Sequence, residues 1–484
     1  MNRKMVFYIF GRIGQVVALL MLLPAIVAVI YDEPRQLWSF LGTAFFAALA
    51  GSVIAWLCRT DNRVIYAKEG FAIVSLAWIY MSAVGALPFV ISGDVSSYVD
   101  ALFETVSGFT TTGASVLTNI EALSKSMLFW RSFTHWVGGM GVLVFVMAVV
   151  SNMTERSIHI MRAEMPGHVV GKLVPRGSDT AKILYLIYIV MTFVQIVLLA
   201  LGDMDLFESI VHTFGTAGTG GFAIKNTGLA GYSSYSQIVI GVFMLLFGIN
   251  FNLYFLIIIG KLKTAIKSTE LWTYLGIAAS AVAIITLNIY FQGGYTSFGV
   301  ALKDAFFQTS SLMTTTGYAT ADFNLWPSLS KGVMLLLMCM GSCAGSTAGG
   351  LKISRVVILF KLIFTEIRRM LHPRAVTSVR FEGKAVDKQT LNSVAVYLVV
   401  YVFCILATFL AVSFEPFGFE TNFSAVIATF NNIGPGFANV GPTSSFAEYS
   451  IFSKLVFSLA MLLGRLEIFP LIIALSPSTW RNGR

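Results

Sequence analysis

Long apolar stretches alternate with short polar segments along almost the whole chain. Each long stretch approaches the roughly 20 residues that a helix needs to cross the hydrocarbon core of a bilayer. The pattern therefore predicts an all-α integral membrane protein with ten full spans. The expected spans cover Ile9–Tyr31, Leu37–Cys58, Phe71–Ile91, Met127–Val150, Ala181–Leu201, Ile238–Ile259, Tyr274–Tyr290, Val333–Ile353 or beyond, Asn392–Val412 and Leu455–Leu475.

A short polar segment recurs between pairs of these spans. Asp100–Gly113 and Asp304–Gly317 align without gaps and share the leading Asp-Ala, a central threonine and the closing Thr-Thr-Thr-Gly. Glu208–Gly221 is a weaker third copy, and Ser424–Gly434 is a fourth. The fourth copy is shorter, so Gly436 competes with Gly434 for the place of its closing glycine. Recurrence at matching positions indicates one repeated unit of span, short segment and span.

The short segments are too polar and too short to cross a bilayer. Each is expected to enter as a half-helix and to return as extended chain, which is tolerated at membrane depth only where it is buried in protein or lines water. The sequence thus predicts four non-identical helix–pore-loop–helix repeats around a central pore, plus two extra N-terminal transmembrane helices. The expected units are 1–68 for the extra pair and 69–179, 180–268, 269–389 and 390–484 for the repeats.

The closing residues of each segment suit a dehydrated monovalent cation, above all potassium. Rings of backbone carbonyls from four loops supply oxygens without fixed charge, and glycine reaches the φ values that such loops need. Threonine hydroxyls add ligands or braces, and each half-helix directs its negative C-terminal end at the pore. The alternative is that these small residues only let helices approach closely. The predicted potassium ligands are Thr110, Thr111, Thr112, Gly113, Gly218, Thr219, Gly220, Gly221, Thr314, Thr315, Thr316, Gly317, Asn431, Asn432, Ile433 and Gly434.

Two features interrupt the spans that follow the segments. Gly341–Gly350 is a run of small residues, and because each interior glycine costs a helix about 1 kcal/mol relative to alanine, an open loop is expected there. A helix contact through Gly341 and Gly345 is the alternative. Arg465 lies inside the last span, where a guanidinium must be paired with an acidic group or hydrated, and Glu467 is a possible partner.

The distribution of charged residues indicates how the chain is oriented in the membrane more than what it binds. Hydrophobic residues make up 56% of the chain and charged residues 12%, so the net charge of +9 points to the membrane and not to nucleic acid. Basic residues gather in alternate loops, which predicts that both termini are cytoplasmic; a cleavable signal peptide is not expected. The intervening loops carry acidic residues that can attract cations: Asp94, Asp100, Glu104, Glu121, Asp205, Glu208 and Glu448.

No nucleotide-binding fingerprint, metal-ligand cluster or nucleophile–base pair stands in the sequence, so an enzyme and an organic cofactor are not expected. The four cysteines are expected as free thiols packed among helices.

The chain resembles the Trk/Ktr/HKT superfamily of potassium transporters, and most of all its Trk-type membrane subunits. The resemblance rests on the four filter segments, the extra N-terminal spans, and the segments Arg162–Gly167, His372–Val376 and Asn431–Gly436. Glycine in all four loops is associated with potassium selectivity in that superfamily. The second and fourth loops depart from Thr-Thr-Thr, which argues against four equivalent ion contacts.

The resemblance implies potassium uptake across the bacterial inner membrane. It also implies that a gating loop obstructs the pore below the filter, made by Gly345, Ser346, Thr347, Ala348, Gly349 and Gly350, and that Arg465 projects into the conduction path as a barrier. The implied partners are a second copy in a homodimer and cytoplasmic TrkA-type nucleotide-binding regulatory subunits; the basic segment 352–388 can also meet membrane lipid. A symporter that couples potassium to protons or sodium by alternating access remains the alternative, because broken helices fit it as well.

Overall fold

The computed structural model describes the whole chain apart from residues 1, 61–66, 142–176, 293, 376 and 481–484. Nearly all of the described residues that lie in regular structure are helical. Among these residues the only strands form one short hairpin, β1 (Arg380–Phe381) with β2 (Lys384–Ala385). The predicted all-α class is therefore confirmed. The motif at 162–167 and the end of the Met127–Val150 span lie outside the described residues.

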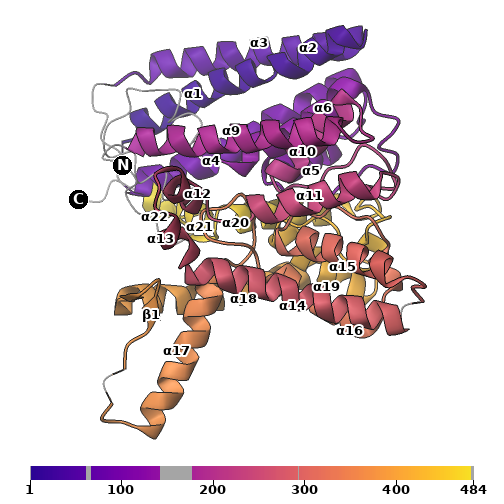
Figure 1. The fold of residues 1–484 in the computed structure, drawn as a ribbon. Helices are drawn as coiled ribbons and strands as arrows, with labels where there is room; N and C mark the ends of the chain where they lie inside the picture. The colour runs from indigo at the N-terminus through magenta and orange to yellow at the C-terminus, as the bar shows by residue number, and fades with distance from the viewer. Residues whose placement is uncertain (1, 61–66, 142–176, 293, 376, 481–484) are drawn as a thin grey trace.

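The N-terminal helices pack side by side along one edge of the molecule (Figure 1). These are α1 (Arg3–Leu20), its continuation α2 (Leu22–Ile30) and α3 (Pro34–Leu57). Glycines let α1 and α3 approach closely, because a Cβ built on Gly11 would lie 2.5 Å from the carbonyl oxygen of Gly51, and one on Gly51 would lie 2.6 Å from that of Gly11.

Four units follow, each with a span, a short helix and a second helix, which is interrupted in the last three units. The first two comprise α4 (Ala67–Ser92), α5 (Tyr98–Phe109) and α6 (Lys125–Gly139), then α9 (Gly177–Ala200), α10 (Leu206–Ala217), α11 (Ser234–Phe247) and α12 (Phe251–Ile258). The last two comprise α14 (Thr269–Gln292), α15 (Phe298–Met313), α16 (Ser328–Cys339) and α17 (Ile353–Leu371), then α18 (Lys388–Val412), α19 (Phe419–Phe430), α20 (Ile451–Arg465) and α21 (Phe469–Leu475).

Short elements complete the described chain. They are α13 (Leu262–Ile266), α22 (Pro477–Trp480) and the 3-10 turns η2 (Phe323–Leu325) and η3 (Ala438–Val440).

The second helices differ from the continuous spans predicted for Ile238–Ile259 and Leu455–Leu475. The axis bends by 88° between α11 and α12, and by 118° between α20 and α21. The first break follows Gly248, and the second contains Glu467 and Ile468, whose φ angles of 56° and 65° cannot continue a right-handed helix. Six described helices are long and apolar enough to span a membrane, or eight if each bent pair counts as one span, so ten spans remains a prediction.

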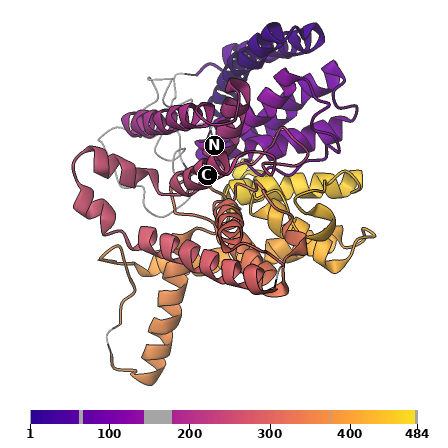
Figure 2. The ribbon, with the colours of Figure 1, turned by 45° about the vertical axis from the view of Figure 1, so that its right-hand side comes forward.

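One end of the molecule carries the termini and the longest projection. Arg3 donates to the backbone carbonyl of Trp480, which brings the described ends of the chain together. Helix α17 extends away from the helical body in both Figure 1 and Figure 2. The β1–β2 hairpin packs beside α17, where Lys361 Nζ donates to the carbonyl of Arg380 at 2.9 Å. Its two-residue turn, Glu382-Gly383, has positive φ at both positions, as tight hairpins favour.

Candidate functional site

Each of the four short helices ends in the same hydrogen-bonded turn. At the end of α5, the N–H of Thr111 donates to Gly108 and the N–H of Thr112 to Ser107, at 3.1 and 2.8 Å. This is a Schellman motif, which satisfies carbonyls that a helix end leaves open. The second of these bonds recurs from Gly220, Thr316 and Ile433 at 2.8, 2.8 and 2.9 Å. The four segments that the sequence aligned only in part therefore share one backbone geometry.

The residue after each helix cap has an unusual conformation. Thr111, Thr219 and Thr315 have φ of 54°, and Asn432 has φ of 57°. Positive φ is an outlier for a β-branched residue, and such strain persists only where the surroundings impose it. Asparagine enters this region more easily, so the departure of the fourth loop from threonine preserves the backbone path.

The closing glycines join the four loops into a ring. A Cβ built on Gly113 would collide with the carbonyl oxygen of Gly220, one on Gly221 with that of Thr316, and one on Gly317 with that of Ile433. The circle closes at Gly434, where a Cβ would lie 2.8 Å from the carbonyl oxygen of Thr112. Each glycine thus packs against the carbonyl of the residue that precedes the next loop's glycine. Segments up to about 320 residues apart in sequence encircle one axis.

The structure also distinguishes Gly434 from Gly436. Gly434 has φ of 96°, like the φ of 78°, 77° and 85° at the other three closing glycines. Gly436 packs against Ser424 and Val440 of its own repeat. Gly434 therefore occupies the fourth place in the ring.

Side chains brace the loops from behind. The hydroxyls of Thr110 and Thr112 lie 2.8 Å apart, and those of Thr314 and Thr316 repeat this distance. Asn432 Nδ2 donates to Thr112 Oγ1 at 3.0 Å and so ties the fourth loop to the first. These side chains are completely buried, so their hydroxyls stabilise the ring.

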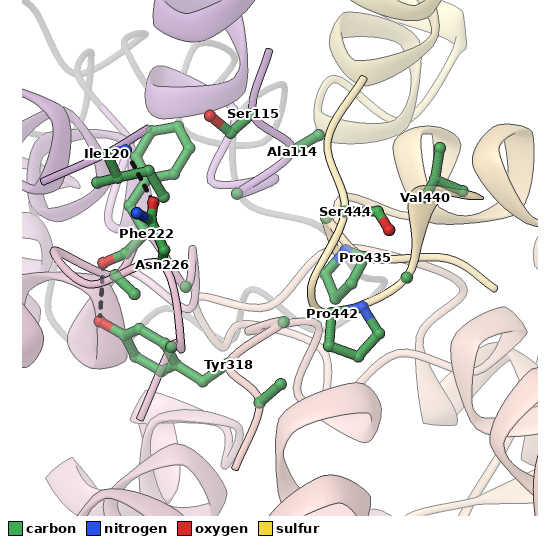
Figure 3. A pocket seen from close by; sticks show the side chains of 18 of the residues that line it. Ala114, Ser115, Ile120, Phe222, Asn226, Tyr318, Pro435, Val440, Pro442 and Ser444 are labelled. Atoms are coloured by element: carbon green, nitrogen blue, oxygen red, sulfur yellow. Dashed lines mark hydrogen bonds between the residues drawn. The ribbon is translucent and has the colours of Figure 1, made fainter. Parts of the chain in front are cut away.

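A mouth cavity of about 90 Å³ opens where the chain leaves the ring (Figure 3). All four closing glycines line it. Residues from each repeat surround it: Ala114, Phe222, Tyr318 and Pro435. Tyr318 hydroxyl donates to the carbonyl of Phe222 at 3.3 Å, so the third repeat also supports the second.

A buried ion pair braces the first two loops, and the sequence interpretation missed it. Arg131 of α6 contacts Glu104 of α5 through Nη2 at 2.6 Å and through Nε at 2.8 Å. Glu104 also accepts from Ser115 Oγ and the N–H of Val116, at 3.0 and 3.2 Å, just beyond the first loop. Arg131 Nη1 donates to the carbonyl of Ala223 beyond the second loop, at 3.3 Å. A charge inside an apolar stretch, the signal that singled out Arg465, also marks Arg131.

Two of the expected outer acidic residues are thus engaged differently. Glu104 is buried in α5 and does not face solvent. Asp100 accepts from Lys454 Nζ at 2.7 Å. The prediction of an open acidic face is therefore wrong for Glu104, which is buried against Arg131, whereas the side chain of Asp100 stays 30% exposed beside Lys454.

His135 links the first two loops without a charge. Its Nδ1–H donates to the carbonyl of Gly108 at 2.7 Å, and its Nε2 accepts from the N–H of Phe222 at 3.3 Å. Both ring nitrogens have the partners that a neutral imidazole requires.

The small-residue run forms a loop from Met340 to Lys352, between α16 and α17. The expected loss of helix is confirmed, and a helix contact through Gly341 and Gly345 is wrong, because neither residue is helical. The loop lies against the ring: the N–H of Gly349 donates to Thr315 Oγ1 at 2.7 Å. Lys352 Nζ donates back into the loop, to the carbonyl of Ala348.

Arg465 ends α20 and contacts this loop. Its Nη1 donates to the carbonyl of Thr347 at 2.7 Å, and its Nη2 donates to Gly138 and Gly139 at 2.6 and 2.8 Å. Glu467, the partner predicted for Arg465, forms its ion pair with Arg355 of α17 at 2.5 Å. Arg465 and Glu467 therefore have different contacts: Arg465 donates to backbone carbonyls, and Glu467 forms an ion pair with α17.

Comparison with known proteins decides the family. A family profile described as a cation transport protein, TrkH, matches residues 38–482. The Trk system potassium uptake protein TrkH of Escherichia coli K12 is 34% identical, over 98% of this chain and all of its own length. The chain belongs to the TrkH family.

The solved structures agree with this assignment to the TrkH family. The crystal structure of the potassium transporter TrkH from Vibrio parahaemolyticus superposes with a TM-score of 0.89 at 32% identity, and the match covers 99% of this chain and 100% of that one. TrkG of Escherichia coli K12, another potassium uptake protein, is 34% identical over 99% of each chain. Family membership thus extends over the whole architecture described above.

Proposed function

We propose that this chain takes up potassium through the pore that the four-loop ring surrounds, as the membrane subunit of a Trk-type system. The observation that carries the proposal is the closed ring, in which four loops of equal backbone geometry face each other through carbonyls and glycines. Carbonyl oxygens held at fixed radius replace the hydration shell of a cation. The family's named relatives are potassium uptake proteins, which supports potassium as the substrate.

We also propose that the loop residues predicted above as potassium ligands, from Thr110–Gly113 to Asn431–Gly434, coordinate the ion. Residues Gly345–Gly350, with Arg465, form the gate. The contact between Gly349 and Thr315 supports a gate directly beneath the ring. A guanidinium at this depth opposes a second cation in its path, so its position also supports a barrier. The division at 68, 179, 268 and 389 belongs to this proposal. The break at 268 falls between α13 and α14, and the other three fall within the first residues of α4, α9 and α18.

The cellular setting is part of the same proposal. We expect the bacterial inner membrane, with both termini in the cytoplasm, a homodimer, and cytoplasmic TrkA-type regulatory subunits. The meeting of the chain ends on one side supports a common location of the termini. Helix α17 carries exposed apolar residues and basic side chains, including Phe364, Met370, Arg368 and Arg369, which suit a protein partner or membrane lipid.

Substitution of Gly113 by serine tests the filter. A Cβ at this position meets the carbonyl of Gly220, and φ of 78° disfavours it, so we expect a distorted ring and a potassium-to-sodium flux ratio at least about tenfold lower. The measurement is cation flux into liposomes that contain the purified protein. Gly231→Ser is the matched control, because a Cβ there meets nothing within 4 Å. Unchanged selectivity in Gly113→Ser, with the control intact, would contradict the proposed filter.

A further inference from the structure

A buried carboxylate holds both the Met340–Lys352 loop, which contains the proposed gate Gly345–Gly350, and the start of α17. Glu270 lies in the first turn of α14 and is only 5% exposed. Its Oε1 accepts from the N–H of Ala344 at 2.7 Å and from the N–H of Ser354 at 3.1 Å. Ala344 belongs to the loop, and Ser354 lies where α17 begins, so one oxygen fastens the loop to the start of the next helix.

The same turn of α14 is attached to the β1–β2 hairpin. Glu382, at the hairpin turn, accepts from Ser268 Oγ at 2.9 Å and from the backbone N–H of Glu270 at 3.0 Å. Ser268 Oγ in turn accepts from the N–H of Leu271 at 3.3 Å. Glu270 therefore connects the two elements: its backbone N–H donates to the hairpin turn, and its side chain accepts from the loop that contains the proposed gate.

The hairpin is well placed to move relative to the pore. It lies at the end of the molecule that carries α17, away from the ring (Figures 1 and 2). Gly383 and Lys384 at its tip are exposed, while Phe381 is buried beneath them. Only its inner face is thus committed to the body of the protein.

We propose that Glu270 is a positioning residue that holds the gating loop in the place where it obstructs the pore. We further propose that the hairpin controls this clasp, the hydrogen bonds of Glu270 to Ala344 and Ser354, through Glu382. The inference rests on the proposed gate. Buried backbone N–H groups must keep an acceptor, so the loop cannot leave its place without giving up the carboxylate that satisfies Ala344. Hydrogen bonds to a charged acceptor are the stronger kind, so the clasp favours the obstructing position. A displacement of the hairpin shifts the N-terminus of α14 and with it the acceptor.

Glu270→Gln tests the clasp, because the amide keeps the shape and loses the charge. The readout is native Cys343, which lies in the loop and is completely buried. With Cys58, Cys339 and Cys404 replaced by alanine, a small charged methanethiosulfonate reagent is applied from the hairpin side of the membrane. We expect the modification rate of Cys343 to rise roughly tenfold, because the amide oxygen is a weaker acceptor than the carboxylate for the N–H groups of Ala344 and Ser354. The potassium-to-sodium flux ratio should not change.

Glu382→Gln tests the hairpin and remains informative if Glu270→Gln does not fold. We expect a rise in the modification rate of about threefold, since the carboxylate of Glu270 is still present. Glu366→Gln is the matched control, because its carboxylate is exposed and pairs with exposed Arg369 at 3.6 Å. An unchanged rate in the folded Glu270→Gln or Glu382→Gln variant overturns the proposal, even if thermal stability falls. The filter is tested separately by Gly113→Ser, so its failure and that of the clasp are distinguishable.

Discussion

At the scale of single residues, strain and buried charge mark the ring. Thr111, Thr219 and Thr315 hold a conformation that their side chains disfavour, and the surrounding hydrogen bonds sustain it. The Glu104–Arg131 pair is 0% and 2% exposed and joins the chain just beyond two loops. Such a pair is more important for geometry than for stability, because desolvation offsets much of its attraction.

Removing one partner of this pair should be worse than neutralising both. Arg131→Met leaves a buried carboxylate and should lower the free energy of unfolding by about 3–5 kcal/mol. The double variant Glu104→Gln with Arg131→Met keeps an acceptor for Ser115 and Val116, so it should recover part of that loss. Thermal unfolding of the purified protein, followed by tryptophan fluorescence, measures both.

The exposed pair Lys331–Glu420, at 3.9 Å, supplies the control for this prediction. Lys331→Met should change the free energy of unfolding by no more than about 1 kcal/mol. A double variant no more stable than Arg131→Met would mean that the carboxylate charge is not what the arginine compensates.

At the scale of elements, the second helix of each described repeat is shortened or broken near the ring. Breaks after α11, α16 and α20 release backbone groups that then meet one another: the N–H of Phe251 donates to Gly345 at 3.1 Å, and the N–H of Cys343 donates to Gly248 at 3.1 Å. The Met340–Lys352 loop is thus held by neighbouring helix breaks. Irregular backbone is tolerated here because other protein backbone satisfies it.

Arg465 is the side chain whose replacement should loosen this arrangement. Arg465→Ala removes donors to Thr347, Gly138 and Gly139 together with a positive charge, so we expect the basal potassium flux to rise roughly tenfold. Arg465→Lys keeps the charge but cannot reach three carbonyls, and its flux should be intermediate. Flux into liposomes is again the measurement. A lower flux in folded Arg465→Ala would show that the arginine supports an open pore.

At the scale of the whole molecule, one chain builds a ring that has fourfold backbone geometry and unequal side chains. The position of Glu104 is occupied by His212, Gln308 and Ala425 in the other repeats, so only the first carries a charged brace. A single chain permits this asymmetry, whereas identical subunits would repeat every brace. The four loops therefore present similar carbonyls with different support behind them.

The route of transport is a property of the whole molecule and separates a pore from a symporter. Alternating access needs a conformational cycle, and domain motions on the millisecond scale limit it to roughly a thousand ions per second. A preformed ring needs no such cycle, so we expect recordings from single proteins to exceed that rate when the gate is open. A slower flux that follows an imposed proton or sodium gradient would favour the symporter.

Sequence patterns alone determined the membrane class, the two extra spans, the repeats and three of the four closing glycines. They could do so because apolar length and local recurrence are encoded within each segment. They also indicated the loop at Gly341–Gly350, since a run of glycines disfavours a helix wherever it lies.

The tertiary structure alone decided what depends on groups far apart in the sequence. It selected Gly434 over Gly436 and paired Glu467 with Arg355 and Arg131 with Glu104. It also joined the Met340–Lys352 loop to Glu270 by a hydrogen bond. The structure also showed bends within two segments that hydropathy predicts as continuous spans. Hydropathy indicates which residues prefer lipid, but it carries no information on the direction of the backbone. A charged residue in an apolar stretch of sequence predicts that a partner is needed, but only the folded chain determines which partner lies within reach.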